Sequence, residues 1–165
     1  MASSLAAYLP SLDAFGCLGA VAALAYVPHC LKIAAVVGAT GGYGMRLPRD
    51  NAERAAAALE KGERPADKQA AHYIRRLQAC HQNHLENFPI IAAAVLSAVA
   101  AGVPAADIDR AATAVLALRA AHLAAYALGS TNAFAYLRAL FWGAGLVPTV
   151  LLFSRAAAAR MASRA

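Results

Sequence analysis

The sequence predicts an all-α integral membrane protein, a bundle of four transmembrane helices, on three observations. The 165-residue chain is 61% hydrophobic with a mean hydropathy of +0.50, above the usual apolar share of a soluble domain. Charged residues make up only 15% and leave long stretches nearly free of charge. Four apolar runs approach the roughly 20 residues that a helical span needs. They cover residues 12–39, 88–103, 111–128 and 133–153, so residues 1–165 are expected to form one membrane domain.

The first predicted helix covers residues 12–39 and carries Pro28, which a membrane helix tolerates when neighbours satisfy the freed carbonyl. A polar loop, residues 40–72, follows. Asn51 in this loop is the expected N-cap of a short surface helix that ends at Gly62.

Three further helices are expected at residues 73–101, 108–128 and 133–153. The first of them must take polar residues into the membrane, because its apolar run alone is too short. Gly102-Val103-Pro104 breaks the chain after it. A basic tail follows the last helix and contains Arg155, Arg160 and Arg164.

The net charge of +6 lies beside apolar spans, which favours a membrane surface as partner over nucleic acid. Eight Lys and Arg residues lie between residues 46 and 76, so this loop is expected to be cytoplasmic and both termini to lie on the other side. The tail arginines count against this orientation. Such a protein would lie in a bacterial inner membrane or a membrane of the endoplasmic reticulum type. Residues 1–13 hold no Lys or Arg, so no cleaved signal peptide is expected.

Cysteines and tyrosines are expected to have structural roles. The three cysteines are odd in number and widely spaced, and they predict buried free thiols rather than disulfides. They are Cys17, Cys30 and Cys80. Three tyrosines are expected to be interface or packing residues, namely Tyr8, Tyr26 and Tyr136.

Polar residues from four separate stretches are expected at one depth, in the leaflet beside the basic loop. They are Lys32; Arg76, His81, Asn83, His84 and Glu86; Arg119, His122 and Tyr126; and Arg138. A charge inside a membrane costs about 3 kcal/mol or more, so such residues face other helices and pair. We expect Glu86 to pair with Arg119, which leaves Arg138 for a ligand. The set therefore predicts a polar ligand pocket.

Simpler interpretations exist for single residues. Asn83 or His122 alone is typical of packing between helices, worth about 1 kcal/mol or less. Arg75 is expected to reach the lipid headgroups. A metal site on His81, His84 and Glu86 is disfavoured, because their spacing suits one tetrahedral ion poorly. No metal is therefore expected.

Residues 76–89 read RLQACHQNHLENFP and resemble the second-helix signature of the MAPEG family, membrane-associated proteins in eicosanoid and glutathione metabolism. The core of that signature, Asn-x-x-Glu-x-x-Pro, begins at Asn83. Residues 119–126 read RAAHLAAY and resemble the third helix of the prostaglandin E synthase branch. Arg138 stands where the family carries a functional arginine. Residues 43–49 read YGMRLPR and resemble the loop after the first helix in many microbial members.

The resemblance implies a homotrimer that binds glutathione between neighbouring subunits toward the cytoplasmic leaflet. The residues expected to bind it are Arg76, Asn83, Glu86, Arg119 and His122. The expected catalytic residues are Arg138, near the sulfur, and Tyr126, a hydroxyl donor.

The implied activity is that of a membrane glutathione transferase or peroxidase. Arginine stays protonated when buried and favours the thiolate, which is the nucleophile. A lipophilic electrophile or hydroperoxide would arrive through the lipid. Ala79, Gln82 and Ala139 depart from the family pattern, so the alternative is a non-catalytic lipid-binding or scaffold protein. A transporter or channel is disfavoured, because the far half of each helix is apolar.

Overall fold

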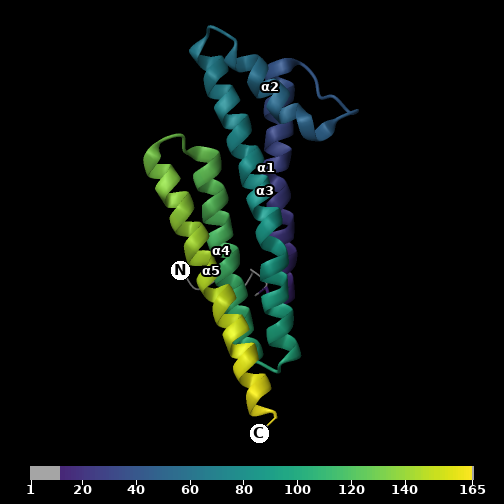
Figure 1. Ribbon diagram of the computed structural model, residues 1–165, viewed down its shortest axis with the longest axis vertical. Helices are drawn as coiled ribbons and strands as arrows, with labels where there is room; N and C mark the ends of the chain where they lie inside the picture. Colours follow the sequence, from purple (N-terminus) through teal and green to yellow (C-terminus); the bar gives the residue numbers. More distant parts are fainter. Residues whose placement is uncertain (1–11, 165) are drawn as a thin grey trace, which may run out of the picture.

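The structure is a computed structural model that describes residues 12–164, and every regular element in this part of the chain is helical. Four long helices follow one long axis, and a short helix and a single 3₁₀ turn lie across one end (Figure 1). They are α1 (Ala14–Thr40), η1 (Pro48–Asp50), α2 (Asn51–Glu60), α3 (Pro65–Ala100), α4 (Ala105–Leu128) and α5 (Asn132–Ala162). Tyr8, expected at an interface, lies outside the described residues.

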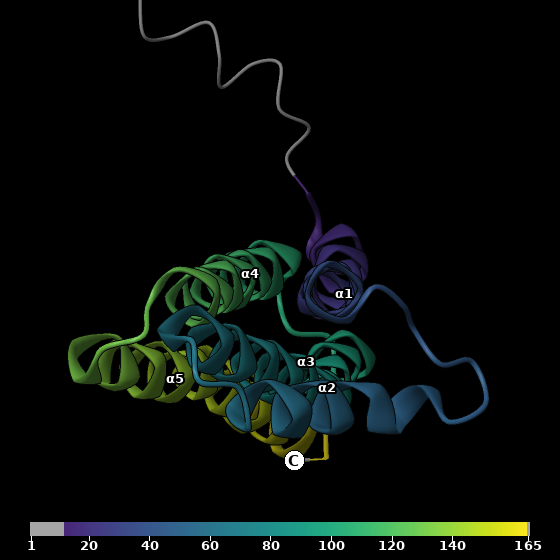
Figure 2. The same cartoon turned by 90° about the horizontal axis from the view of Figure 1, so that it is seen from above.

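Helix α3 is central in this arrangement. It packs against α1, α2, α4 and α5, whereas α1 and α5 make no contact with each other (Figure 2). Side chains that α3 carries therefore meet those of every other helix, which makes α3 the element that positions any shared site.

Three helices are long and apolar enough to cross a membrane, namely α1, α4 and α5. Helix α3 is the longest, at 36 residues, but its first half is too polar to meet the same criterion. The chain is therefore a membrane protein in which one long helix differs in character from the other three.

Three helix boundaries differ by three residues or more from those expected. Helix α3 begins at Pro65 rather than near residue 73, because a proline is well suited to the first turn of a helix. Helix α4 begins at Ala105 rather than residue 108. Helix α5 continues to Ala162 rather than 153, since alanine has the highest helix propensity. Two of the tail arginines, Arg155 and Arg160, thus lie on a helix.

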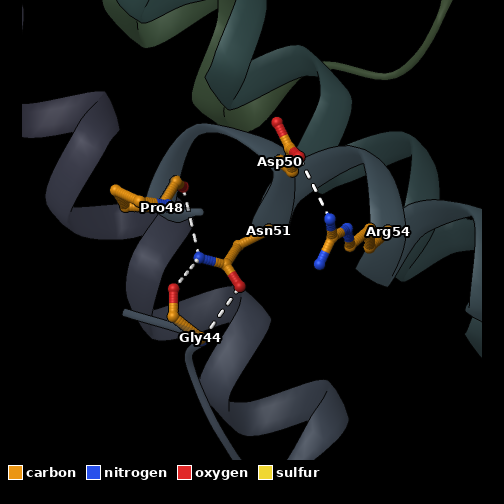
Figure 3. A network of polar contacts seen from close by, with 5 residues as sticks. All are labelled: Gly44, Pro48, Asp50, Asn51 and Arg54. Atoms are coloured by element: carbon orange, nitrogen blue, oxygen red, sulfur yellow. Dashed lines mark hydrogen bonds and ion pairs between the residues drawn. The ribbon is translucent and has the colours of Figure 1, made fainter. Parts of the chain in front are cut away.

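The expected N-cap role of Asn51 is wrong. Asn51 lies in the first turn of α2, and its side chain bonds the preceding loop (Figure 3). Its Nδ2 donates to the carbonyls of Gly44 (2.8 Å) and Pro48 (3.2 Å), and its Oδ1 accepts from the Gly44 amide (2.9 Å). One amide side chain thus closes the loop between α1 and α2.

Helix α2 lies on the end of α3 through a small apolar face. Ala52 and Ala55 are buried with Ile74 of α3. Arg75 of α3 forms ion pairs with Glu53 and Glu60 of α2. The guanidinium of Arg75 holds the pKa of the Glu53 carboxyl below its usual range. Arg75, expected to reach lipid headgroups, instead binds α2.

The helices approach closely through small residues at the opposite end. Ala94 and Ala98 of α3 pack with Ala112 of α4 in a buried cluster that includes Cys17. Small residues allow close packing of helices in membranes. All three cysteines are free, but Cys30 is exposed, contrary to expectation. Tyr26 and Tyr136 are both exposed on the surface of the single chain.

Candidate functional site

A large cleft opens where the first half of α3 faces the turn between α4 and α5. Its volume is about 990 Å³. Its polar lining residues are Gln69, His72, Tyr73, Arg75, Arg76, Tyr126, Ser130 and Arg138, and its remaining lining residues are Ala66, Ala70 and Ala79. Figure 1 shows that α3 extends beyond the turn that joins α4 to α5.

Arg138 has an unusual environment in this cleft. Its guanidinium carbon lies 4.6 Å from the centre of the Tyr126 ring, a cation–π contact. Its Nη1 is buried and has no hydrogen-bond partner among the described residues. A buried guanidinium N–H without a partner leaves a strong donor available to a ligand.

Arg76 lies close to Tyr126 from the other side. Its Nε donates to the Tyr126 carbonyl at 3.4 Å, and its guanidinium carbon lies 5.5 Å from the centre of the Tyr73 ring. The Tyr73 ring therefore contacts Arg76 and the Tyr126 ring contacts Arg138, so each ring packs against one arginine of the cleft.

The tight turn between α4 and α5 brings Tyr126 and Arg138 together. Gly129 is buried in this turn, and a Cβ there would overlap the side chain of Phe134. Only glycine lets Phe134 pack this closely on the turn, which sets where the first turns of α5 lie relative to the end of α4.

The cleft is strongly basic. Three arginines line it and no Asp or Glu does. Of the three, Arg75 is occupied by the two glutamates of α2, whereas Arg76 and Arg138 form no ion pair within the described chain. Two uncompensated guanidinium groups in one partly enclosed cleft select an anionic ligand.

A second layer of polar side chains lies between α3 and α4, below the cleft. Arg119 is 2% exposed, and its Nη1 donates to Asn83 Oδ1 at 3.0 Å. Its Nε has no partner in the described structure. The expected pairing of Arg119 with Glu86 is wrong for the single chain, since Glu86 is exposed and forms no ion pair with a described residue.

The two layers are joined through aromatic contacts. The rings of His122 and Tyr126 lie 5.0 Å apart, edge to face, and those of His84 and His122 lie 5.4 Å apart. A path of packed rings therefore runs from the cleft into the interior, along α4.

Expected site residues separate into three places. Arg76, Tyr126 and Arg138 line the cleft. Asn83, Arg119 and His122 form the layer below it, and Glu86 lies on an exposed face of α3.

Lys32, expected with this set, belongs to a separate polar cluster between α1 and α3. It is 3% exposed, and its Nζ donates to Gln78 Oε1 at 2.7 Å and lies 3.2 Å from His29 Nδ1. In the same region His81 Nδ1 lies 2.8 Å from the Ala25 carbonyl, in the turn of α1 that precedes Pro28. The expectation of a single cluster is therefore wrong for Lys32, although its contact with Gln78 places it at the level of Arg76 and His81 on α3.

Sequence reasoning assigned no role in the site to Tyr73 and Ser130. Tyr73 precedes Arg76 by three residues and so continues a helical face already recognised, whereas Ser130 lies in the turn after α4 ends. That spacing was the available signal. Their positions depended on where α3 begins and α4 ends.

The apolar helices and the basic cleft define a helical membrane protein with a basic cleft at one end. The family resemblance is confirmed by comparison with known proteins. The chain belongs to the MAPEG family, whose model matches residues 15–158, nearly the whole chain. Neither the curated proteins nor the solved structures gave a match. The protein is thus a membrane protein of a family related to glutathione and eicosanoid metabolism.

Proposed function

We propose that the protein is a membrane-bound, glutathione-dependent transferase or peroxidase that acts on lipophilic electrophiles or hydroperoxides. The observation that carries the proposal is Arg138, whose buried, unpartnered Nη1 lies in a cleft without carboxylates. Family membership supplies glutathione as the expected ligand.

Glutathione suits the cleft by charge and size. It carries two carboxylates and one ammonium group, so it is a net anion even with a neutral thiol. Arg76 and Arg138 offer the two free guanidinium groups. A cleft of about 990 Å³ is at the upper end of ligand sites, which leaves room for a second substrate.

Arg138 would act on the sulfur of glutathione. A free thiol has a pKa near 8.5 and is about 97% protonated at neutral pH. A guanidinium a few ångströms away favours the thiolate, and more strongly where water is scarce. The thiolate attacks an electrophilic carbon, a C–S bond forms, and the leaving group departs with the bonding electrons. The Tyr126 hydroxyl can donate a proton to that group.

A peroxidase reaction uses the same thiolate. The sulfur attacks the terminal oxygen of a hydroperoxide, and the O–O bond breaks to release an alkoxide, which Tyr126 protonates. A second glutathione then reduces the sulfenic acid and gives glutathione disulfide and water.

The proposal includes the membrane topology. Helix α3 crosses the membrane with α1, α4 and α5 as a single domain, and the loop that contains α2 faces the cytoplasm. The membrane is a bacterial inner membrane or one of the endoplasmic reticulum type. Glutathione then enters the cleft from water, and the lipophilic substrate enters from the bilayer.

The protein is also proposed to form a homotrimer. Glu86 and Gln82 are exposed on α3 in the single chain, within the part of the helix that crosses the membrane under this proposal. A carboxylate that faces lipid is costly, so a neighbouring copy is expected to cover this face. Asn83 and Glu86 would complete the glutathione site at that boundary.

One observation favours a second candidate, a non-catalytic lipid-binding member of the same family. Ala79 lines the cleft and is exposed, where the family resemblance leads one to expect an arginine. One cation fewer weakens the capture of the glutathione carboxylates.

Calorimetric titration of the detergent-purified protein with glutathione separates the two candidates. The parent should bind glutathione and conjugate it to a small aryl halide. The Arg138→Ala variant should lose at least tenfold in kcat/KM at pH 7, because a thiol pKa raised by one unit cuts the thiolate fraction about tenfold. Arg160→Ala, near the far end of the same helix, is the control and should match the parent.

Equal activity in the parent and Arg138→Ala would contradict the thiolate role. Absence of glutathione binding by the parent would favour the lipid-binding candidate.

A further inference from the structure

We propose that Cys80, His84 and His122 form a binding site for one soft metal ion, Cu(I), between α3 and α4. These three side chains present one sulfur and two imidazole nitrogens that lie within 4.8 Å of one another. The site is separate from the cleft, and its proposal does not depend on glutathione binding.

The geometry of the pair on α3 fits a metal ion directly. Cys80 and His84 are four residues apart on one helix, and Cys80 Sγ lies 3.6 Å from His84 Nδ1. Metal–sulfur and metal–nitrogen bonds of about 2.3 and 2.0 Å place these atoms about 3.5–3.7 Å apart in tetrahedral or trigonal geometry. The three ligand atoms lie within 4.8 Å of one another, so His122 needs to approach by about an ångström to complete the site.

The burial of His122 supplies an independent observation. The side chain is 2% exposed, and its Nδ1 is buried with no hydrogen-bond partner among the described residues. An imidazole nitrogen that loses water without gaining a partner destabilises the folded protein. A bound metal ion would satisfy that nitrogen.

The surroundings of His84 match those of a metal ligand. Its Nδ1 lies 2.9 Å from the Cys80 carbonyl and its Nε2 lies 3.4 Å from the Arg119 carbonyl. A neutral ring donates to only one of these acceptors, so the other nitrogen keeps a lone pair. Metal-binding histidines commonly donate their second ring N–H to a backbone carbonyl, which fixes the ring. His84 Nδ1, which lies near Cys80 Sγ, can thus bind the ion while Nε2 faces the Arg119 carbonyl.

Charge and ligand number favour Cu(I) over Zn(II). Arg119 lies one turn before His122 on α4 and is a buried cation. Cu(I) bound to the Cys80 thiolate is neutral overall, whereas Zn(II) with one thiolate adds a further positive charge. Three ligands suit Cu(I), whereas structural zinc sites are almost always four-coordinate. Thiolate ligands select Cu(I), and imidazole suits copper. Binding forms the Cu–S bond and releases the thiol proton to the buffer.

The test is Cu(I) titration of the detergent-purified full-length chain, in the absence of glutathione, against a coloured Cu(I) chelator. The parent should bind one Cu(I) per chain and take it from the chelator. Cys80→Ser and His122→Phe should each weaken binding at least tenfold. Cys30→Ser and Cys17→Ser, which change the two thiols outside the cluster, should bind as the parent does.

A second measurement guards against variants that do not fold. In a chain with Cys17→Ser and Cys30→Ser, Cys80 is the remaining thiol. Cu(I) should slow its alkylation in mild denaturant at least tenfold, and X-ray absorption should show one sulfur and two nitrogens.

Absence of Cu(I) binding, or binding unchanged in folded Cys80→Ser and His122→Phe, would overturn the site. Tighter binding of Zn(II) than of Cu(I) would overturn the choice of ion.

Discussion

Arg119 is a cation that the protein buries with little compensation. Among the described residues its side chain has one hydrogen-bond partner, the Asn83 amide, and its Nε has none. Hydrogen bonds to charged groups contribute about 1.5–3 kcal/mol, compared with about 1 kcal/mol between neutral groups. Asn83 thus joins two helices, which agrees with the simpler interpretation that the sequence offered for it.

The Asn83→Ala substitution should lower the free energy of unfolding by about 1.5–3 kcal/mol, because it leaves Arg119 without its partner. Denaturant unfolding in detergent measures the loss. Asn87→Ala is the control. It removes a hydrogen bond between neutral groups, from Asn87 Nδ2 to the Asn83 carbonyl, and should cost about 1 kcal/mol. Equal losses in the two variants would contradict this assignment.

A comparable prediction of lost stability concerns Gly129, in the turn beside the cleft. Gly129→Ala should destabilise the protein by about 1–3 kcal/mol, because its Cβ must displace Phe134. The shift should also reduce glutathione conjugation, since Arg138 follows Phe134 by one helical turn. Thermal unfolding and initial rates measure both effects.

The control for that variant is Gly143→Ala, whose Cβ meets no atom within 4 Å. It should stabilise α5 by about 0.5–1 kcal/mol, as alanine has the higher helix propensity. Similar effects of the two substitutions would show that Phe134 does not constrain the turn.

At this scale, helical spacing had a clear limit. It correctly placed Arg119, His122 and Tyr126 along one face of a helix. It could not distinguish Asn83 from Glu86 as the partner of Arg119, and the expected partner, Glu86, was wrong. Residues three apart differ by only about 60° around a helix, so both were compatible with the spacing. The choice depends on the rotation of α3 against α4, which is a tertiary property.

The side chain of Asn51 stabilises the loop that precedes helix α2. Asn51 joins the loop at Gly44 and Pro48 with three hydrogen bonds (Figure 3). This loop contains Arg46 and Arg49, both exposed.

The Asn51→Ala substitution should open this loop. Trypsin should then cleave after Arg46 and Arg49 at least tenfold faster, while the unfolding temperature of the long helices changes little. Arg54→Ala is the matched control, because it removes only an exposed ion pair with Asp50. Equal cleavage rates in the parent and Asn51→Ala would contradict the role of Asn51.

The positions of the long helices were largely predictable, because long apolar runs identify α1, α4 and α5 directly. The start of α3 was not, since residues 65–72 are polar and were assigned to the loop. Interactions such as that of Arg75 with Glu53 join residues that are 22 positions apart in the sequence, and no local pattern encodes them.

The single chain leaves a polar face of α3 uncovered, and the proposed trimer follows from it. Glu86→Leu should lower the trimer fraction in native mass spectrometry, because the substitution removes the carboxylate that is proposed to bind the neighbouring copy. Glu63→Leu, an exposed glutamate outside the apolar runs, is the control and should leave assembly unchanged. An unchanged trimer in Glu86→Leu would assign that carboxylate to another role.

Helix α3 extends beyond the turn that joins α4 to α5, so these elements end at different heights (Figure 1). The cleft that contains Arg138 lies between them. Under the proposed function, glutathione would reach this cleft from water, and the lipophilic substrate would reach it from the bilayer along α4 and α5. Neither reactant would then have to cross the medium in which it is insoluble.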